Sequence, residues 1–381
     1  MKTHSVLPPS SASIWGAPNG CTGWPKMNQM FPGEEGEAAK EGTAAHYVAE
    51  NMIQVGHNPA VNVEADFIGR TALNGVIINE EMVNSVRIYA NNVIREFEAR
   101  PKAFRGVEVT QPAPAIHPEN YGTMDAVLYD SERKEIILWD YKHGRAPVEA
   151  YRNWQAINYL SAIVSHLNIT DPSIAVQVRI IQPRAFHRDG IIRIWHTTLS
   201  ALYPFFATLK ENAQKAMGDK AETRSGKHCR YCTARAYCQA ALTAGLQMFE
   251  AVDRPLASEP TPEQLGGLLA LVQRARKQLE YLESGYEEQV KSIIRSGAVV
   301  PGWSVVPGYG RRQWAKTDAE IFALGDLMGV NLQDIKAVTP AQAEKLGLNK
   351  DLVGAYTETP KKGFKLKLDN GSKAKQIFNG E

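Results

Sequence analysis

The chain has 381 residues, with 43 Lys and Arg against 41 Asp and Glu, so its net charge is only +2. A hydrophobic content of 44% and a charged content of 22% are typical of globular proteins and exclude a wholly disordered chain. The near balance of charge excludes a uniformly basic surface, so any DNA path must be local. No stretch approaches the ~20 apolar residues that span a bilayer, and the start of the chain lacks the apolar core of a signal peptide. We therefore expect a cytoplasmic protein with reduced thiols, no membrane partner and more than one domain.

One of the first predicted helices carries a histidine. Residues 7–13 are rich in serine and proline and offer a cap for a short helix. Glu34 to Val55 is predicted to be a helix with His46 near its middle, and Asn79 to Arg100 is predicted to be a second, amphipathic helix. A lone histidine on an alanine-rich helix is more often packed in the core than bound to a metal. A role for His46 therefore needs support from elsewhere in the chain.

Three strands follow, and acidic residues interrupt their apolar runs. The predicted strands begin at Val107, run from Thr123 to Tyr129, and run from Glu135 to Tyr141 after a polar turn. Side chains alternate along a strand, so Asp140 and Lys142 point to the same side. If Asp125 lies in register on the neighbouring strand, two carboxylates and an ammonium meet at one edge of the sheet. Glu108 is a possible further carboxylate there, although exposed glutamates are common on strands.

Close carboxylates repel each other, and a bound divalent cation removes that penalty. Oxygen ligands with open positions suit Mg²⁺ or Mn²⁺, and a neighbouring lysine can stabilise developing charge or help position and deprotonate the attacking water. This combination favours metal-assisted phosphodiester hydrolysis. The alternative is a surface hairpin with an ordinary salt bridge.

Four short motifs occur in an informative order: GTAAH ending at His46, GTMD ending at Asp125, DYK from Asp140 to Lys142, and QAINY from Gln155 to Tyr159. In this order the chain resembles the RecB-like branch of the PD-(D/E)xK nucleases. The resemblance implies an α/β fold with a central mixed sheet flanked by helices. It implies His46, Asp125, Asp140 and the Tyr141 carbonyl as ligands of Mg²⁺ or Mn²⁺. It also implies Lys142 as the catalytic lysine, supported by Gln155 and Tyr159. His143 departs from the family pattern, in which a small hydroxyl residue is more usual.

The four cysteines form a second pattern. Cys229, Cys232 and Cys238 follow a C-x2-C-x5-C spacing, and Cys21 lies 208 positions before Cys229 (229 − 21). Such a set is consistent with a [4Fe–4S] cluster, with Zn²⁺, or with unliganded core thiols. The spacing resembles the iron–sulfur nucleases of CRISPR adaptation and AddB-type nuclease domains. That resemblance implies a [4Fe–4S] cluster that staples the N-terminal segment to the end of the nuclease domain.

The later part of the chain contributes candidate DNA contacts. Strands are predicted for Ile174–Pro183 and Gly190–Thr197, and helices for Leu199–Met217, Thr261–Ser296, Asp318–Met328 and Pro340–Leu346, with a short β unit at Pro301–Trp314. The candidate DNA-binding residues are Arg179, Arg184, Arg311, Arg312 and Trp314, for which solvated arginines and ordinary hairpin packing are the alternatives. Thr359–Gly380 is rich in lysine and is expected to be a solvated tail or a source of salt-sensitive DNA affinity. We divide the chain into a nuclease domain at 1–250 and a mainly helical, basic appendage at 251–381 for DNA binding or interactions.

The function that the motifs favour is a metal-dependent DNA exonuclease acting on single strands or DNA ends. The alternatives are a catalytically degenerate DNA-binding or assembly protein, and a structure- or site-specific endonuclease. The sequence contains no phosphate-loop motif, so an ATP-driven motor is not expected within it. A separate helicase, recombinase or single-strand-binding protein is the expected partner. The resemblance implies a member from a phage or mobile element, active in replication or recombination in the bacterial cytoplasm.

Overall fold

The protein is described by a computed structural model that covers residues 5–33, 36–56, 66–252, 261–309, 312–332, 338–345, 347–358 and 361–368. Its contacts divide the chain into two units, Met1–Leu282 and Glu283–Glu381, and we describe each unit by itself. No helix in these ranges combines the length and the hydropathy that crossing a membrane would require.

A five-stranded mixed sheet forms the centre of the first unit. Its strands, in spatial order, are β1 (Phe104–Pro112), β2 (Tyr121–Asp130), β3 (Glu135–Tyr141), β4 (Ala175–Ile181) and β5 (Ile192–Thr198). Neighbouring strands are antiparallel except β3 and β4, which are parallel. A parallel pair needs a crossover connection, and helix α6 (Trp154–His166) supplies it. The expected α/β fold with a mixed sheet is thereby confirmed.

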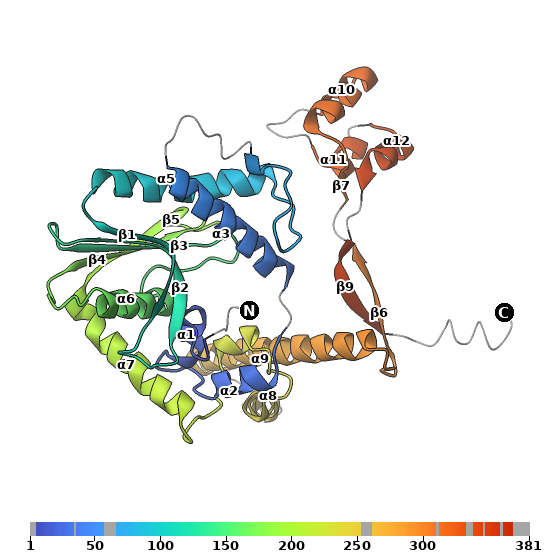
Figure 1. Ribbon diagram of the computed structural model, residues 1–381. Helices are drawn as coiled ribbons and strands as arrows, with labels where there is room; N and C mark the ends of the chain where they lie inside the picture. The colour runs from blue at the N-terminus through green and yellow to red at the C-terminus, as the bar shows by residue number, and fades with distance from the viewer. Residues whose placement is uncertain are drawn as a thin grey trace. The chain divides into compact units, whose positions relative to one another are not determined.

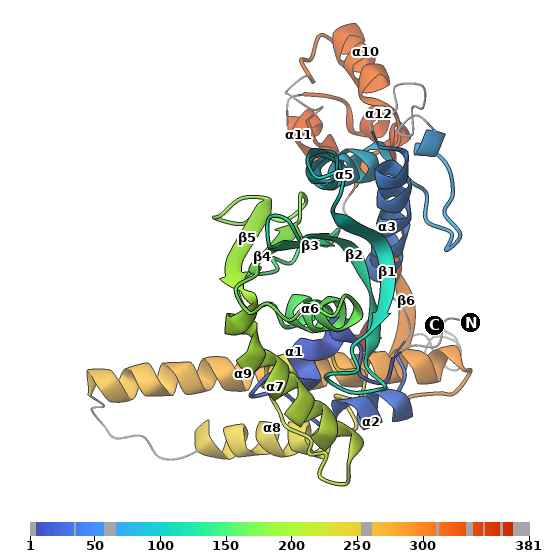
Figure 2. The same cartoon turned by 60° about the vertical axis from the view of Figure 1, so that its left-hand side comes forward.

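Helices cover both faces of this sheet. Helices α3 (Glu37–Val55) and α5 (Glu80–Ala99) lie on one face, and α6 and α7 (Leu199–Met217) lie on the other (Figure 1). The sheet curves, and α6 lies on its concave side (Figure 2). The central strand β3 is buried on both faces: Ile136 and Leu138 belong to the core on the α6 side, and Ile137 and Trp139 belong to the core on the α5 side. This explains why its sequence is almost uniformly apolar up to Asp140.

The N-terminal segment packs against α6 and β2. It forms η1 (Pro9–Ser11), α1 (Ala12–Trp15) and α2 (Trp24–Met30). The side chain of Asn120 donates to the carbonyl of Leu7 over 3.0 Å, which holds the segment against the end of β1–β2. A side chain at Gly122 would come within 2.8 Å of Pro9. The glycine of the GTMD motif is therefore needed for this close approach.

The first unit ends within a long helix. After α7 the chain forms η2 (Lys227–Tyr231), α8 (Gln239–Val252) and α9 (Pro262–Arg295). Ala275, Gln278 and Leu282 are buried at helical spacing along α9. The side chain of Leu282 lies where a side chain at Gly245 of α8 would meet it. This packing places the division between the units inside α9, whereas the sequence analysis divided the chain at residue 250.

The second unit combines short helices with two small sheets. Its helices are α10 (Asp318–Met328), α11 (Pro340–Lys345) and α12 (Lys350–Ala355). The sheets pair β6 (Trp303–Tyr309) with β9 (Lys361–Leu368), and β7 (Gln313–Trp314) with β8 (Thr357–Glu358). The lysine-rich segment, which was expected to be a solvated tail, begins as the strand β9. The sequence KKGFKLKL alternates between lysine and apolar residues over its second half, which favours extended structure. Residues 369–381 lie outside the described ranges.

Candidate active site and cysteine site

Two aspartates lie opposite each other where the β2–β3 ladder ends. The last paired residues are Ala126 and Trp139, so the antiparallel register sets Asp125 across from Asp140. Opposite residues of an antiparallel pair project to the same face. Beyond the last pair, the backbone N–H of Tyr141 donates to Asp125 Oδ2 over 2.6 Å. A side-chain hydrogen bond thus replaces the ladder at this point, and the two carboxylates stand at the end of the strands.

Glu108 brings a third carboxylate from β1. The β1–β2 pairing skips this residue between Val107 and Val109, at the position that faces Asp125. Its φ of 49° lies in the left-handed region, which costs a non-glycine residue about 1 kcal/mol or more. Glu108 Oε1 lies 3.3 Å from His46 Nδ1, and Asp125 Oδ1 lies 3.5 Å from the same nitrogen. Among the described residues, these three form the group of potential metal ligands whose atoms all lie within 4.8 Å of one another.

His46 reaches the acidic group from the edge of α3. Its neighbours Ala45 and Ala49 are buried, and their small side chains belong to the core between α3, α5 and the sheet. The His46 side chain is 30% exposed and that of Glu108 is 24% exposed. The group is therefore held by the core on one side and open to incoming ligands on the other.

Lys142 is held beside Asp140 by helix α6. Its Nζ lies 3.0 Å and 2.9 Å from the two oxygens of Asp140. The same ammonium donates to Gln155 Oε1 over 3.0 Å, and Gln155 Nε2 donates to the hydroxyl of Tyr159 over 3.4 Å. The side chain of Asn153 caps α6, which fixes Gln155 in its first turn. The DYK and QAINY motifs therefore meet in space.

The electrostatics of the group show a surplus of negative charge. Burial lowers the pKa of His46, but Asp125 and Glu108 outweigh it and raise that pKa to about 9. Burial raises the pKa of Asp125 and of Asp140, against the effect of His46 and Lys142. For Lys142, the two aspartates raise the pKa although burial lowers it. Three carboxylates thus face one ammonium and one imidazole, and a divalent cation would relieve the repulsion among the carboxylates.

The arrangement differs in one respect from the predicted ligand set. His46 and Asp125 come together as expected, but Glu108 completes their group, and Asp140 is paired with Lys142. In a strand, the N–H and C=O of one residue point to the same side, so the Tyr141 carbonyl faces the side of Asp125. Carboxylate, imidazole and carbonyl donors of this kind suit Mg²⁺ or Mn²⁺. Sequence analysis underrated Glu108; the signal that could have found it was its register opposite Asp125.

His143 has a structural place beside this group. It is buried, and its Nδ1 lies 2.8 Å from the hydroxyl of Tyr141. Burial and the charge of Arg184 lower the pKa of His143 to about 4, so the ring is neutral at physiological pH. The Tyr141 ring in turn packs against Tyr89 at 5.1 Å between centroids. His143 therefore holds the Tyr141 side chain in place through this hydrogen bond.

The predicted DNA-binding arginines of the first unit are engaged with acids. Arg179 is buried, and its Nη2 lies 2.8 Å from Glu96. Arg184 lies 3.2 Å from both Glu41 and Glu81 and is 14% exposed. These contacts are those of residues that join the sheet to α3 and α5. Both arginines are thus paired with acids within the first unit.

Two of the predicted DNA-binding residues of the second unit, Arg312 and Trp314, make contacts within that unit. Arg312 pairs with Glu344, and the Trp314 indole donates to the Val338 carbonyl over 2.7 Å. Trp314 packs against the small core of this unit. Arg311 lies outside the described residues.

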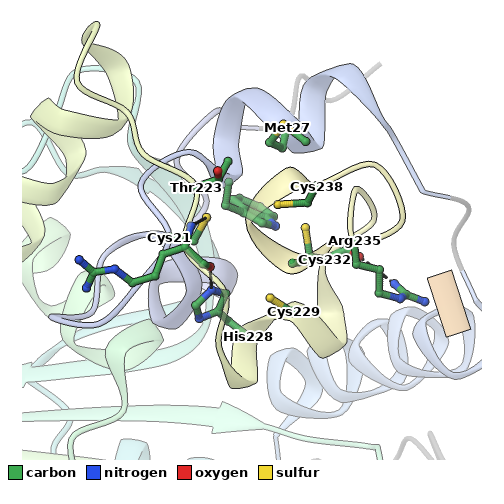
Figure 3. A pocket seen from close by; sticks show the side chains of 11 residues that line it. Cys21, Met27, Thr223, His228, Cys229, Cys232, Arg235 and Cys238 are labelled. Carbon is green, nitrogen blue, oxygen red and sulfur yellow. Dashed lines mark hydrogen bonds between the residues drawn. The ribbon is translucent and has the colours of Figure 1, made fainter. Parts of the chain in front are cut away.

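The four cysteines come together from two distant segments of the chain. Cys21, Cys229, Cys232 and Cys238 line one pocket, and their sulfur atoms point toward a shared space (Figure 3). The segments are joined by contacts on either side of the thiols. Phe31 stacks on Tyr237 at 4.1 Å between ring centroids, and Gly23 N–H donates to the Glu222 carbonyl over 2.8 Å. The N-terminal segment is thus fastened to the chain after α7.

The surroundings of the thiols act on their charge in opposite ways. Cys21 Sγ accepts a hydrogen bond from the Arg224 N–H at 3.3 Å, and Cys229 Sγ accepts one from the Gly226 N–H at 3.3 Å. Burial raises the pKa of Cys232 to about 11, and the neighbouring thiols add to the shift. Four thiolates packed this closely therefore need a cationic centre to hold them ionised.

The four sulfur atoms are not drawn together around one point. In the part of the chain that the structure describes, no three of the cysteine sulfurs lie within 4.8 Å of one another. A single tetrahedral Zn²⁺ holds each sulfur at about 2.3 Å and so separates them by about 3.8 Å. The sulfurs therefore stand farther apart than they would around a bound Zn²⁺, while four cysteines at one pocket are a ligand set that suits either an iron–sulfur cluster or Zn²⁺.

A family model described as "Protein of unknown function (DUF2800)" matches residues 4–367. The chain belongs to this family. One solved structure that resembles this DUF2800 protein is that of a protein described as a "Putative exonuclease" from Eubacterium rectale. The sequence identity is 12%, the match covers 68% of this chain and 92% of that chain, and the TM-score is 0.35. A likeness of this size carries no argument about fold or activity.

Proposed function

We propose that this DUF2800 protein is a metal-dependent nuclease that hydrolyses DNA phosphodiester bonds. The observation that supports this most is the meeting of Asp125, Asp140 and Lys142 at one strand end, with His46 and Glu108 beside them. Three carboxylates around an imidazole, with one lysine held by two partners, form a site for a divalent cation and a phosphate. A surface hairpin with a salt bridge would not bury both aspartates.

His46, Glu108 and Asp125 would hold the cation, and Asp140 and the Tyr141 carbonyl would complete its ligands on the other side. Mg²⁺ or Mn²⁺ in this place would polarise a phosphoryl oxygen and lower the pKa of a bound water. The side chains of His46 and Glu108 are open enough for solvent and a substrate to reach them. The buried hydrogen bond from Tyr141 N–H keeps Asp125 in one orientation.

Lys142 would stabilise the charge that develops on the phosphate as water attacks phosphorus and the bond to the leaving oxygen breaks. In the metal-free site burial lowers its pKa, but Asp140 and Asp125 outweigh burial and raise it, which favours the protonated amine there. Gln155 and Asp140 fix the ammonium from two directions, and Tyr159 fixes Gln155. A positioned charge of this kind contributes through preorganisation.

The substrate class follows from the motif resemblance. It supports an exonuclease on single-stranded DNA or DNA ends, serving replication or recombination of a phage or mobile element. A structure- or site-specific endonuclease would use the same chemistry on another substrate. A degenerate DNA-binding protein is disfavoured because each motif residue of the site is present and in contact with its partner.

We further propose that the cysteine pocket holds a [4Fe–4S] cluster. The meeting of four cysteines at one pocket and the N–H donors to Cys21 and Cys229 support it. The cluster would fasten α2 to the segment that follows α7. Its role in this proposal is structural, because the cysteines and the acidic group belong to different pockets.

The proposal is tested with purified protein and Mn²⁺ or Mg²⁺ on end-labelled single strands, duplexes and closed circular DNA. Loss of linear DNA with circles spared indicates an exonuclease, and cut circles indicate an endonuclease. Asp140→Ala should lower cleavage by about 100-fold or more, whereas Asp171→Ala, at an exposed carboxylate paired with Lys134, should leave it unchanged. Wild-type turnover by Asp140→Ala would refute the assignment.

A further inference from the structure

A cavity of about 510 Å³ opens beside the cation group. His46, Glu108 and Asp125 line it, together with Tyr47 and Glu50 of α3 and with residues 72–74. Ligand pockets commonly occupy ~300–1,000 Å³, so this cavity has room for a group of nucleotide size. A ligand in it would lie next to whatever occupies the cation group, because the same side chains line both.

The segment that closes one side of the cavity is a tight hairpin. Ala72 N–H donates to the Val76 carbonyl over 2.8 Å, and Gly75 N–H donates to the Ala72 carbonyl over 2.9 Å. Gly75 has φ +81°, which matches a three-residue turn that ends in a left-handed residue. The side chain of Asn74 donates to the Lys40 carbonyl over 2.7 Å, which fastens the turn to α3. The hairpin tip is therefore held in one place.

This tip presents an apolar side chain to solvent. Leu73 is fully exposed, at 103% of its reference area, although it lines the cavity. Tyr47 also lines the cavity; it is 46% exposed, and its ring meets Phe67 edge-on at 5.7 Å between centroids. A leucine and an aromatic ring that both line an open cavity offer two apolar surfaces for a flat ligand.

Away from the cation group, the charge of the lining disfavours a phosphate as the occupant. Among the described residues that line the cavity, Glu50, Glu108 and Asp125 are acidic and none is lysine or arginine. A cation at the neighbouring group would offset Glu108 and Asp125, but Glu50 would remain. A neutral ring with N–H donors at its edge fits this setting, since carboxylates accept hydrogen bonds from the amino groups of bases.

We propose that the cavity binds one unpaired nucleobase, that of the nucleotide adjoining the phosphate at the cation group. The proposal rests on the proposed nuclease function. Leu73 and Tyr47 contact the faces of the base, and Glu50 accepts from its edge. A base inside a duplex is stacked and paired and cannot enter such a cavity without being extruded. The cavity therefore selects single strands and frayed ends over closed duplex.

The test is a double-mutant cycle on the full chain, loaded with Ca²⁺ to measure binding and with Mn²⁺ to measure cleavage. Short single-stranded oligonucleotides carry one abasic position, moved stepwise along the strand. In the wild type, one abasic position should weaken binding on the order of tenfold. In Tyr47→Ala and Leu73→Ala this penalty should shrink to within about twofold, with unchanged Mn²⁺ affinity.

Matched controls are Tyr203→Ala, at a tyrosine that is 42% exposed on α7, and Leu269→Ala, at a leucine that is 59% exposed on α9. Both controls should keep the full abasic penalty.

An equal penalty in all five proteins, or no sensitive position in the wild type, would overturn the proposal. A shift of Leu73→Ala from dimer to monomer without any abasic effect would also overturn it and assign the tip to self-association. Abasic sensitivity in a wild type that does not cleave with Mn²⁺ would instead refute the nuclease function and leave the base pocket standing.

Discussion

Glu108 and Asp125 occupy facing positions of β1 and β2, yet the described ladder between these strands passes over them. Glu108 takes a φ of 49°, and its carboxylate lies 3.3 Å from His46 Nδ1. Such strain persists where the surrounding structure enforces it, and it is concentrated at functional sites. At this skipped pair, the carboxylates of Glu108 and Asp125 both lie within 3.5 Å of His46 Nδ1. Glu108 can therefore be tested in two ways, as a metal ligand through its carboxylate and as a strained residue through its backbone.

The first prediction is that Glu108→Gln weakens Mn²⁺ binding by about tenfold or more, because it removes one charge from a three-ligand group. Isothermal titration of the protein with Mn²⁺ measures the effect. Glu119→Gln, at an exposed glutamate in the loop between β1 and β2, is the control and should bind as the wild type does. Equal affinity of both variants would remove Glu108 from the ligand set.

The second prediction uses the strain at the same position. Glu108→Gly should weaken Mn²⁺ binding as Glu108→Gln does. In the metal-free protein, however, the free energy of unfolding of Glu108→Gly should exceed that of Glu108→Gln by roughly 1 kcal/mol, because glycine adopts a positive φ without a steric cost. Urea unfolding of both variants without metal gives the comparison. If glycine destabilised the protein relative to glutamine, the backbone strain at residue 108 would not be as the φ value indicates.

Much of this site was predictable because short-range rules determine it. The alternation along β3 fixed Asp140 and Lys142 on one side, and the four-residue spacing on α6 fixed Gln155 and Tyr159 on one face. Glu108 was harder to predict, because its contribution depends on a backbone irregularity that no residue type near it announces. The burial of Arg179 was not predictable either, because its partner Glu96 lies on a helix distant in sequence.

The third prediction concerns Lys142. Lys142→Met should lower cleavage about 100-fold or more with little change in Mn²⁺ affinity, because the ammonium is not a ligand. Gln155→Ala should lower turnover less, since Asp140 still holds the lysine. Lys134→Met, at an exposed lysine in the turn before β3, should leave both turnover and Mn²⁺ affinity unchanged. A loss of Mn²⁺ affinity in Lys142→Met equal to its loss of turnover would contradict the separation of roles.

The fourth prediction is a pH dependence of stability. Burial raises the pKa of Glu96, but its hydrogen bonds with Arg100 and Arg179 outweigh burial and lower it. A lowered carboxyl pKa contributes stability that is fully present above the unfolded value of about 4.3 and is lost as the pH falls through the folded value. The difference in unfolding free energy between wild type and Glu96→Gln should therefore shrink from pH 6 toward acid. A difference that stays constant over this range would exclude Glu96 as a source of acid sensitivity.

The last prediction concerns the cysteines. Anaerobically purified protein should be brown and should hold iron and sulfide in a near one-to-one ratio, whereas a zinc protein would be colourless. Cys21→Ser should lose the cluster, and so should Cys238→Ser, because each removes one of four thiolates. Loss of the cluster should lower thermal stability, since it closes a loop of about 200 residues between Cys21 and Cys229.

Activity should also fall in these variants, because the same N-terminal segment contacts β2 at Gly122, three residues before Asp125. Measuring the melting temperature and the Mn²⁺ affinity of each variant separates lost stability from damage to the acidic group. If losing the cluster releases the N-terminal segment, a protease should cut between α1 and α3 sooner than in the wild type, and the Mn²⁺ affinity should also fall. A colourless, fully active preparation without metal at these thiols would contradict both the cluster and its structural role.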